Sequence, residues 1–129
     1  MAFAVIRTEE LEWEPRAAEG GEENRHVAGL SDRAGFRHTR ANLWRYAPGA
    51  RGRRHRDMRQ EETFVVLRGT LAAYLGDPPE RHEVGSGELV HVESGTPLQL
   101  ANEGGEEVVL YAYGAPPERG HAEFLDSAV

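Results

Sequence analysis

Residues 48–69 of the chain read PGARGRRHRDMRQEETFVVLRG. The segment opens on a Pro-Gly turn signal, passes through polar residues, and ends in the apolar run Thr63–Leu67. A short apolar run next to turn residues is typical of a β-strand, and its lack of alternation predicts burial on both faces. Residues 108–113, VVLYAY, predict a second strand of the same kind.

The rest of the chain predicts an all-β domain. Its 15 glycines and 7 prolines leave few stretches long enough for helices. The one helix-like window, Thr8–Ala18, is broken by Pro15, so we expect a turn of helix or an extended arm there. Eight short strands separated by turns predict a sandwich or barrel, with strands at 25–31, 36–46, 62–68, 70–75, 81–84, 89–92, 98–101 and 108–113.

Composition narrows the class of protein. The 129 residues suit one domain, no apolar stretch is long enough to span a membrane, and a net charge of −7 disfavours nucleic-acid binding. The chain has no cysteine and no lysine, which excludes disulfides, thiolate chemistry and Schiff bases. We therefore expect a cytoplasmic protein whose partner is a small molecule, with no role for nucleic acid or membrane.

The opening segment also carries a spaced motif, G-x5-H-x-D-x4-E-x6-G. It resembles the first signature motif of the cupin superfamily, G-x5-H-x-H-x3–4-E-x6-G. Gly49, His55, Glu62 and Gly69 match that pattern. Asp57 stands where cupins usually have the second histidine.

Residues 87–102, GELVHVESGTPLQLAN, resemble the second cupin motif, G-x5-P-x-G-x2-H-x3-N. Leu98 replaces the metal-binding histidine of that motif, and Glu93 replaces its proline. The matching positions are Gly87, Gly95 and Asn102.

The two resemblances imply a small single-domain cupin, an antiparallel double-sheet jelly-roll β-barrel. Residues 36–115 would form the barrel, residues 1–35 an arm and first strands that complete the barrel or a dimer, and residues 116–129 a C-terminal tail. The side chains expected in the interior are His55, Asp57, Glu62, Phe64, Val66, Leu98 and Leu100.

The resemblance implies a metal site, because four such positions converge on one divalent ion in metal-binding cupins. Here His55, Asp57 and Glu62 are the candidate ligands, and residues two apart on a strand share a face. Leu98 supplies no ligand, and one imidazole with two carboxylates holds an ion more weakly than three imidazoles with one carboxylate. We therefore expect no tightly held cofactor and at most a weakly bound divalent transition metal.

The function favoured by these residues is binding of a small polar molecule inside the barrel. His55, Asp57 and Glu62 beside Phe64 and Leu98 would form an apolar wall with a few convergent polar groups, which is typical of a ligand pocket. One alternative is a metal-dependent enzyme of the dioxygenase or isomerase type that uses the three candidate ligands. Another is a metal-free acid–base isomerase or epimerase centred on His55 and Glu62.

The same side chains also fit a structural role, in which His55 and Glu62 form a buried hydrogen-bonded pair. Asp57 would then turn toward Arg54 or Arg59.

Other polar residues have weaker patterns. His91 would supply the missing ligand only if its face of the strand is interior. A face with His38, Arg40, Asn42 and Trp44 would give a polar pocket with an aromatic wall if it lines the barrel mouth. The basic residues Arg51, Arg53, Arg54, Arg56 and Arg59 are expected to pair with carboxylates such as Glu61 and those of residues 19–23.

The two strands that are apolar on both faces need a cover beyond the barrel interior, either the N-terminal arm or a second subunit. We expect a homodimer in which an outer sheet face with Val65 and Leu67 packs against its symmetry mate or against a swapped arm that carries Trp13.

Overall fold

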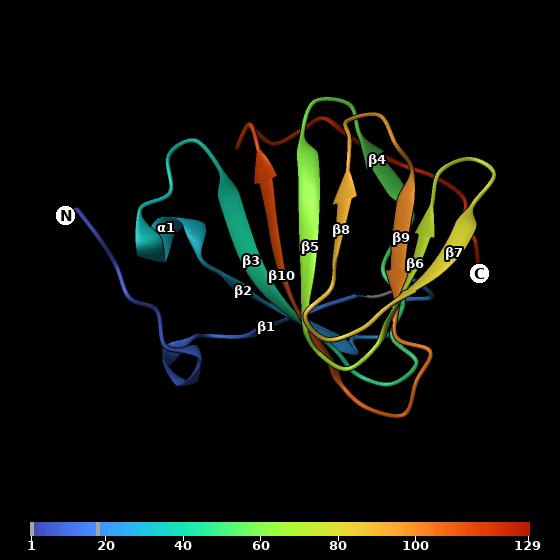
Figure 1. Ribbon diagram of the computed structural model, residues 1–129, viewed down its shortest axis with the longest axis horizontal. Coiled ribbons are helices and arrows are strands. Elements are labelled where there is room, and N and C mark those ends of the chain that lie inside the picture. The colour runs from blue at the N-terminus through green and yellow to red at the C-terminus, as the bar shows by residue number, and fades with distance from the viewer. Residues whose placement is uncertain (1, 18) are drawn as a thin grey trace.

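A computed structural model of the protein describes residues 2–17 and 19–129. In chain order, its elements are the 3₁₀ turn η1 (Thr8–Glu10), β1 (Glu14–Arg16), β2 (Arg25–Gly29), α1 (Ser31–Ala34), β3 (Arg40–Tyr46), β4 (His55–Asp57), β5 (Glu61–Arg68), β6 (Leu71–Leu75), β7 (Glu80–Val84), β8 (Leu89–Val92), β9 (Leu98–Ala101), β10 (Val108–Ala115) and β11 (Ala122–Phe124). The strands form two antiparallel sheets, with orders β1-β2-β3-β10-β5-β8 and β11-β4-β9-β6-β7 (Figure 1). This confirms the expected all-β, double-sheet jelly-roll.

The expected strands are all present, although some of their ends differ. Residues 36–39 lie in a loop before β3, because the chain first makes the single helical turn α1. Within the window expected as a turn of helix or an arm, residues 8–10 form a 3₁₀ turn and residues 14–16 a strand, and Ala18 lies outside the described residues. The sequence pattern does not predict β1 or β11, because each is only three residues long and carries no apolar alternation.

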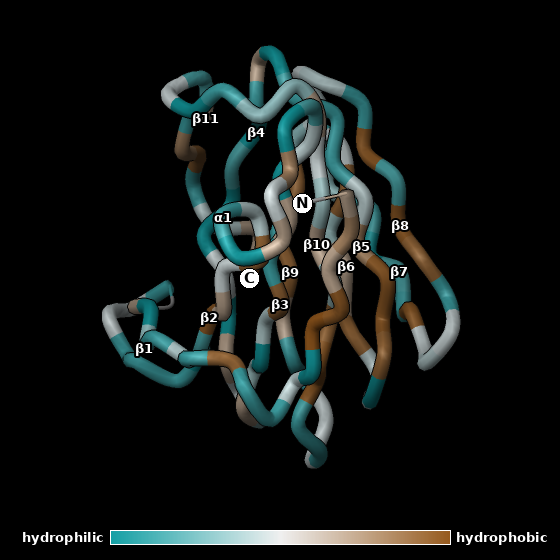
Figure 2. Tube along the Cα trace, turned by 90° about the vertical axis from the view of Figure 1, so that its left-hand side faces the viewer, coloured by the Kyte–Doolittle hydropathy of each residue, from teal (hydrophilic) through white to brown (hydrophobic). Residues whose placement is uncertain are grey.

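The main core lies between the two sheets. It includes Phe64 and Val66 from β5, Leu98 and Leu100 from β9, and Leu110 from β10, all at most 5% exposed. In Figure 2 the hydrophobic colour follows the strands, including β6 and β8, while most loops at the two ends are hydrophilic. Burial of each large apolar side chain contributes roughly 1.5–3 kcal/mol, so this layer accounts for much of the barrel's stability.

A second, smaller core lies on the outer face of the six-stranded sheet. There the N-terminal arm packs Leu11 and Trp13 against Leu43 of β3, with Tyr111 of β10 beside them. The arm therefore supplies the outer cover that the sequence of β10 requires. Leu67 at the end of β5 is 49% exposed, so the outer face there is not covered in the same way.

The structure contains no helix of the length and apolar character needed to cross a membrane, as far as residues 2–17 and 19–129 are concerned.

Candidate functional site

A cavity of about 330 Å³ lies inside the barrel, between the two sheets. Its apolar wall is formed by Phe64, Leu98, Leu100, Leu110 and Ala112. Its polar lining comes from both sheets and from the loop before β4, so the site depends on the closed barrel and not on any one strand.

Four of the five residues expected at the ligand site line this cavity, namely His55, Glu62, Phe64 and Leu98. His55 on β4 lies directly opposite Leu98 on β9. Glu62 reaches the cavity from β5 in the other sheet, and its side chain is 12% exposed. The antiparallel fold thus brings together His55 of the first motif and Leu98 of the second, which are 43 positions apart in the sequence.

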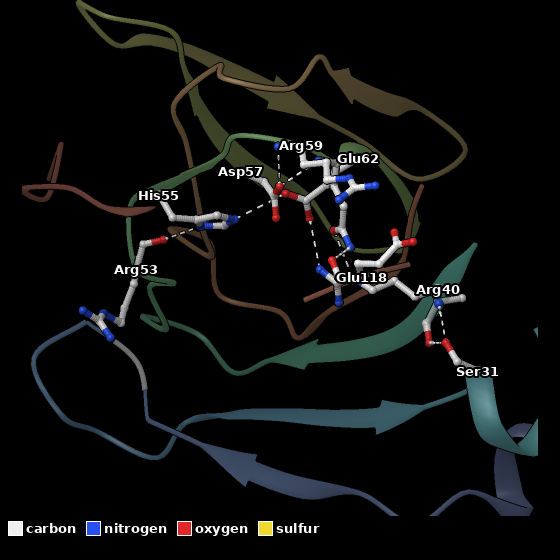
Figure 3. Close-up of polar contacts among 10 residues, drawn as sticks. Ser31, Arg40, Arg53, His55, Asp57, Arg59, Glu62 and Glu118 are labelled. Carbon is white, nitrogen blue, oxygen red and sulfur yellow. Dashed lines mark hydrogen bonds and ion pairs between the residues drawn. The ribbon is translucent and has the colours of Figure 1, made fainter. Parts of the chain in front are cut away.

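His55 and Glu62 form the central polar pair of the cavity (Figure 3). His55 Nε2 lies 3.4 Å from Glu62 Oε1, and His55 Nδ1 lies 3.1 Å from the carbonyl oxygen of Arg53. A carbonyl oxygen only accepts hydrogen bonds, so this contact assigns a proton to Nδ1. Nε2 is then the nitrogen that exchanges a proton beside the Glu62 carboxylate.

The surroundings of His55 favour its charged form. Burial by itself lowers the pKa of the imidazole, but the interactions with Glu62, with the Arg53 carbonyl and with the charge of Asp57 outweigh it. The pKa of His55 is therefore raised above its ordinary value.

Asp57 lies elsewhere than expected. Its side chain is buried, and its Oδ1 accepts hydrogen bonds from the backbone N–H groups of Arg59, at 2.9 Å, and Gln60, at 2.7 Å (Figure 3). Aspartate often closes a turn in this way, and here it shapes the connection from β4 to β5. Asp57 is not among the residues that line the cavity, and its carboxylate bonds to the backbone amides of Arg59 and Gln60 instead of turning to an arginine side chain.

The donor set around His55 does not fit a divalent metal ion. Among the described residues, no three histidine, cysteine, aspartate or glutamate side chains gather closely enough to hold one. Of the candidate ligands, His55 and Glu62 face each other, and Leu98 places an isobutyl group opposite the histidine. In addition, Arg40 Nη2 lies 3.9 Å from Glu62 Oε2, so a guanidinium already neighbours the one carboxylate of the pair.

Four arginines line the cavity: Arg16 from β1, Arg25 from β2, Arg40 from β3 and Arg53 from the loop before β4. Glu62 is the one acidic residue of the lining within the described part of the chain. The cavity is therefore cationic although the chain as a whole carries a net charge of −7.

Arg25 is held rigidly at the cavity wall. Its Nη2 donates to the carbonyl oxygen of Ala17 at 2.7 Å, and its Nη1 donates to the Tyr46 hydroxyl at 3.2 Å. The guanidinium also lies 5.0 Å from the ring centre of Trp44, a distance typical of a cation–π contact. A guanidinium fixed in this way retains N–H groups for a ligand.

Arg53 lies over the ring of Phe124, 3.6 Å from its centre. Phe124 belongs to β11, where it is paired with His55 of β4. The segment 116–129, expected as a tail, therefore contributes a wall of the site. No signal in the sequence marks this role, because β11 is short and follows a polar stretch.

The other polar candidates divide between the cavity and the surface. Arg40, Asn42 and Trp44 line the cavity, as expected if that face forms the barrel mouth. His38 is exposed in the loop before β3, and His91 is exposed on β8, where its Nδ1 lies 2.8 Å from Thr63 Oγ1. Neither histidine lines the cavity.

Two arginines of the basic cluster at residues 51–59 pair with carboxylates, but not with those expected. Arg56 contacts Glu123 at 2.8 Å and Arg54 contacts Asp77 at 3.7 Å. Glu61 instead lies 3.9 Å from His91, on the outer side of β5 and β8. The partners differ because β11 and the loop after β6 lie beside the cluster in the fold.

A double-sheet jelly-roll that carries a histidine and a glutamate inside its barrel is the architecture of a cupin. The family model described as a cupin domain matches residues 42–113. The chain belongs to the cupin family.

Solved structures agree with this fold. A sugar phosphate isomerase from a cupin superfamily of Silicibacter pomeroyi superposes with a TM-score of 0.79 at 21% identity, over 96% of this chain and 83% of that one. The polyketide cyclase RemF from Streptomyces resistomycificus gives 0.80 at 19% identity, over 96% and 86%. A predicted oxalate decarboxylase from Thermotoga maritima gives 0.76 at 17% identity, over 87% and 98%. These similarities show the fold alone, and no curated protein matches the chain.

Proposed function

We propose that the barrel binds a small polar molecule that carries a negative charge, without a tightly held metal ion. The observation that carries this proposal is the set of four arginines around a single carboxylate in a cavity of about 330 Å³. Arginine presents a planar fork of N–H groups that fits carboxylate and phosphate oxygens. The volume lies at the small end of the range for ligand pockets, which is roughly 300–1,000 Å³.

The aromatic residues support the same proposal. Trp44 and Phe124 stack against Arg25 and Arg53, so the guanidinium groups are oriented before a ligand arrives. Orientation in advance lowers the conformational entropy lost on binding. An anion with a short carbon skeleton would place its charge on these arginines and its skeleton against the apolar wall.

A thermal-shift screen tests the proposal with three groups of compounds: phosphorylated sugars, small aliphatic and aromatic carboxylic acids, and neutral sugars. We expect the anions to raise the melting temperature and the neutral sugars to leave it unchanged. Because a hydrogen bond to a charged group contributes about 1.5–3 kcal/mol, Arg25→Met and Arg53→Met should each weaken binding about tenfold or more.

Arg56→Met is the matched control, because Arg56 lies next to His55 in the sequence but pairs with Glu123 outside the cavity lining. A hit that shifts the double variant His55→Ala, Glu62→Ala as much as the native protein would place binding elsewhere. The absence of any hit among the anions would reject the proposal.

A second candidate is acid–base isomerisation, and the geometry of His55 favours it. Its Nδ1 is anchored to the Arg53 carbonyl and its Nε2 faces Glu62, while the raised pKa keeps a proton available beside a carboxylate. Glu62 would remove a proton from carbon next to a carbonyl group, and the imidazolium would donate one to the carbonyl oxygen. The sugar phosphate isomerase among the similar structures is consistent with this chemistry.

Deuterium exchange tests this second candidate directly. Each phosphorylated sugar that binds is incubated with the protein in D₂O, and NMR follows deuterium entering the carbon next to the carbonyl. We expect exchange with the native protein, and its loss in Glu62→Gln. Binding without exchange would leave a binding protein and exclude this isomerase reaction for the sugars tested.

A further inference from the structure

Arg40 has a position that the anion-binding proposal alone does not explain. It is directly opposite Gly114 of β10, and Gly114 is directly opposite Glu62 of β5. Residues that face each other across antiparallel strands share one side of the sheet, so Arg40 and Glu62 lie on the same side with a glycine between them. Without a side chain at Gly114, Arg40 extends over β10 toward Glu62.

Gln60 fixes the direction of that arginine. Its Oε1 accepts a hydrogen bond from Arg40 Nε at 2.9 Å, and its Nε2 donates to the carbonyl oxygen of Glu118 at 3.1 Å. Gln60 is only 2% exposed, so both ends of its amide are held in a buried setting. With Nε bonded to Gln60, the terminal nitrogens of Arg40 face the cavity, and Nη2 lies 3.9 Å from Glu62.

Asp57 in turn fixes Gln60. Its carboxylate accepts the backbone N–H of Gln60 at 2.7 Å and thereby sets where β5 begins. The room is limited at the same point, because a Cβ at Gly114 would lie 2.9 Å from the carbonyl oxygen of Glu61 and 3.4 Å from Gln60 Oε1. Asp57, Gln60 and Gly114 therefore act together on a single side chain.

We infer that Arg40 supplies the fixed positive charge of this cavity, and that its guanidinium, not a metal ion, binds the ligand oxygen beside His55 and Glu62. Gln60 and Asp57 position the arginine side chain, and Gly114 leaves the space through which it reaches the cavity. His55 approaches Oε1 of Glu62 and Arg40 approaches Oε2, so a nitrogen group of this chain lies beside each oxygen of the carboxylate. A divalent ion between these groups would be repelled by the guanidinium. Arg40 is a binding residue, and Asp57, Gln60 and Gly114 are positioning residues.

The first experiment measures binding of inorganic phosphate by calorimetry at low ionic strength, and this part rests on the proposed anion site. Arg40→Met should weaken phosphate binding at least tenfold, and Gln60→Met about threefold. If Gln60 acts through Arg40, the double variant binds phosphate no more weakly than Arg40→Met alone. Arg45→Met is the control, since Arg45 lies on the same strand but pairs with Glu107 outside the cavity lining.

The second experiment does not depend on any anion. Leu98→His adds an imidazole opposite His55, and zinc affinity is measured by competition with a chelator in tag-free protein. We expect Leu98→His, Arg40→Met to bind zinc at least tenfold more tightly than Leu98→His alone. A merely unfolded or loosened site would lose zinc as well as phosphate, so opposite changes in the two affinities identify the role of the charge.

The inference is overturned if removing Arg40 leaves zinc affinity unchanged or lowers it in the Leu98→His background. It is also overturned if Arg40→Met and Arg45→Met have equal effects on phosphate. If the native protein binds no phosphate, the anion proposal fails for this probe while the zinc comparison still decides the role of Arg40. If Arg40→Met does not fold, Arg40→Lys is used instead, because it keeps the positive charge. In this variant we expect weaker phosphate binding, and no gain in zinc affinity in the Leu98→His background.

Discussion

His55 shows how one backbone contact determines the chemistry of a side chain. The carbonyl oxygen of Arg53 accepts a hydrogen bond from Nδ1 and leaves Nε2 facing Glu62. The sequence motif predicts that these two residues meet inside the barrel, but it contains no information on which ring nitrogen faces the cavity. That choice follows from the loop before β4, which places the carbonyl oxygen of Arg53 within hydrogen-bonding distance of the ring.

The raised pKa of His55 makes the stability of the protein depend on pH. A raised folded-state value means that the folded protein binds this proton more tightly than the unfolded chain does. The stability from His55 is fully present below the unfolded pKa, near 6.5, and is lost as pH rises through the folded value. Urea denaturation of native protein and His55→Gln at pH 6 and pH 9 should therefore give a larger difference at pH 6. Glu62→Gln should remove most of that dependence, and equal differences at the two pH values would contradict the assignment.

Gly69 is a motif residue whose role is steric. Its φ is +80°, and a Cβ there would lie 2.6 Å from the carbonyl oxygen of Glu107. Gly69→Ala should lower the free energy of unfolding by about 1–3 kcal/mol, because the residue would be strained and would also push β10 away. Gly105→Ala is the control, since its Cβ would meet nothing within 4 Å and its φ lies outside the left-handed range. Denaturation curves that coincide for the two variants would contradict this explanation.

Among single residues, the sequence predicts those that belong to the two motifs and misses those that arrive from distant segments. His55, Glu62, Phe64 and Leu98 line the cavity as expected. Asp57 does not line it, because its carboxylate accepts hydrogen bonds from the backbone N–H groups of Arg59 and Gln60. Facing the apolar wall of the cavity would leave that carboxylate without these bonds. Arg25 reaches the cavity only through the pairing of β2 with β3, which local patterns do not contain.

Strand β11 has only three residues, but one of them, Phe124, lines the cavity. It pairs with β4 at the edge of its sheet (Figure 2). This places the ring of Phe124 under the guanidinium of Arg53. Apolar strands such as β5 and β10 are predictable because their composition requires burial. A three-residue edge strand is not, because only its partner's position defines it.

Phe124→Ala should separate orientation of Arg53 from stability. The ring is 57% exposed, so its loss removes little buried surface and should cost less than about 1 kcal/mol of unfolding free energy. Anion affinity should fall about threefold or more, because Arg53 is no longer held over the cavity. Phe3→Ala, at an exposed phenylalanine of the arm, serves as the control. Unchanged affinity in Phe124→Ala would show that the stacking does not orient Arg53.

The assembly of the whole molecule remains a prediction, which rests on the outer face of β5 and β8. Leu67 and Leu89 are 49% and 59% exposed there, and Val65 is half-buried beside them. We propose that this face packs against a second copy, since several large apolar side chains at roughly 1.5–3 kcal/mol each would sustain an interface. Light scattering at micromolar concentration should give a dimer for the native protein and a monomer for Leu67→Glu. Met58→Glu, at another exposed apolar residue, should stay dimeric, and a monomeric native protein would refute the proposal.

The cavity has two origins in the chain, and this has an evolutionary consequence. His55, Glu62 and Leu98 fall within the stretch matched by the family, residues 42–113, whereas Arg16, Arg25 and Phe124 come from flanking segments on either side of it. Both residues of the His55–Glu62 pair lie within the matched stretch, so substitutions of Arg16 and Arg25 in the flank change the cavity lining without replacing either member of the pair. Proteins descended from one ancestor could therefore change their ligand through substitutions in the flanking segments while they keep the same His–Glu pair. Relatives with similar motifs need not share a substrate.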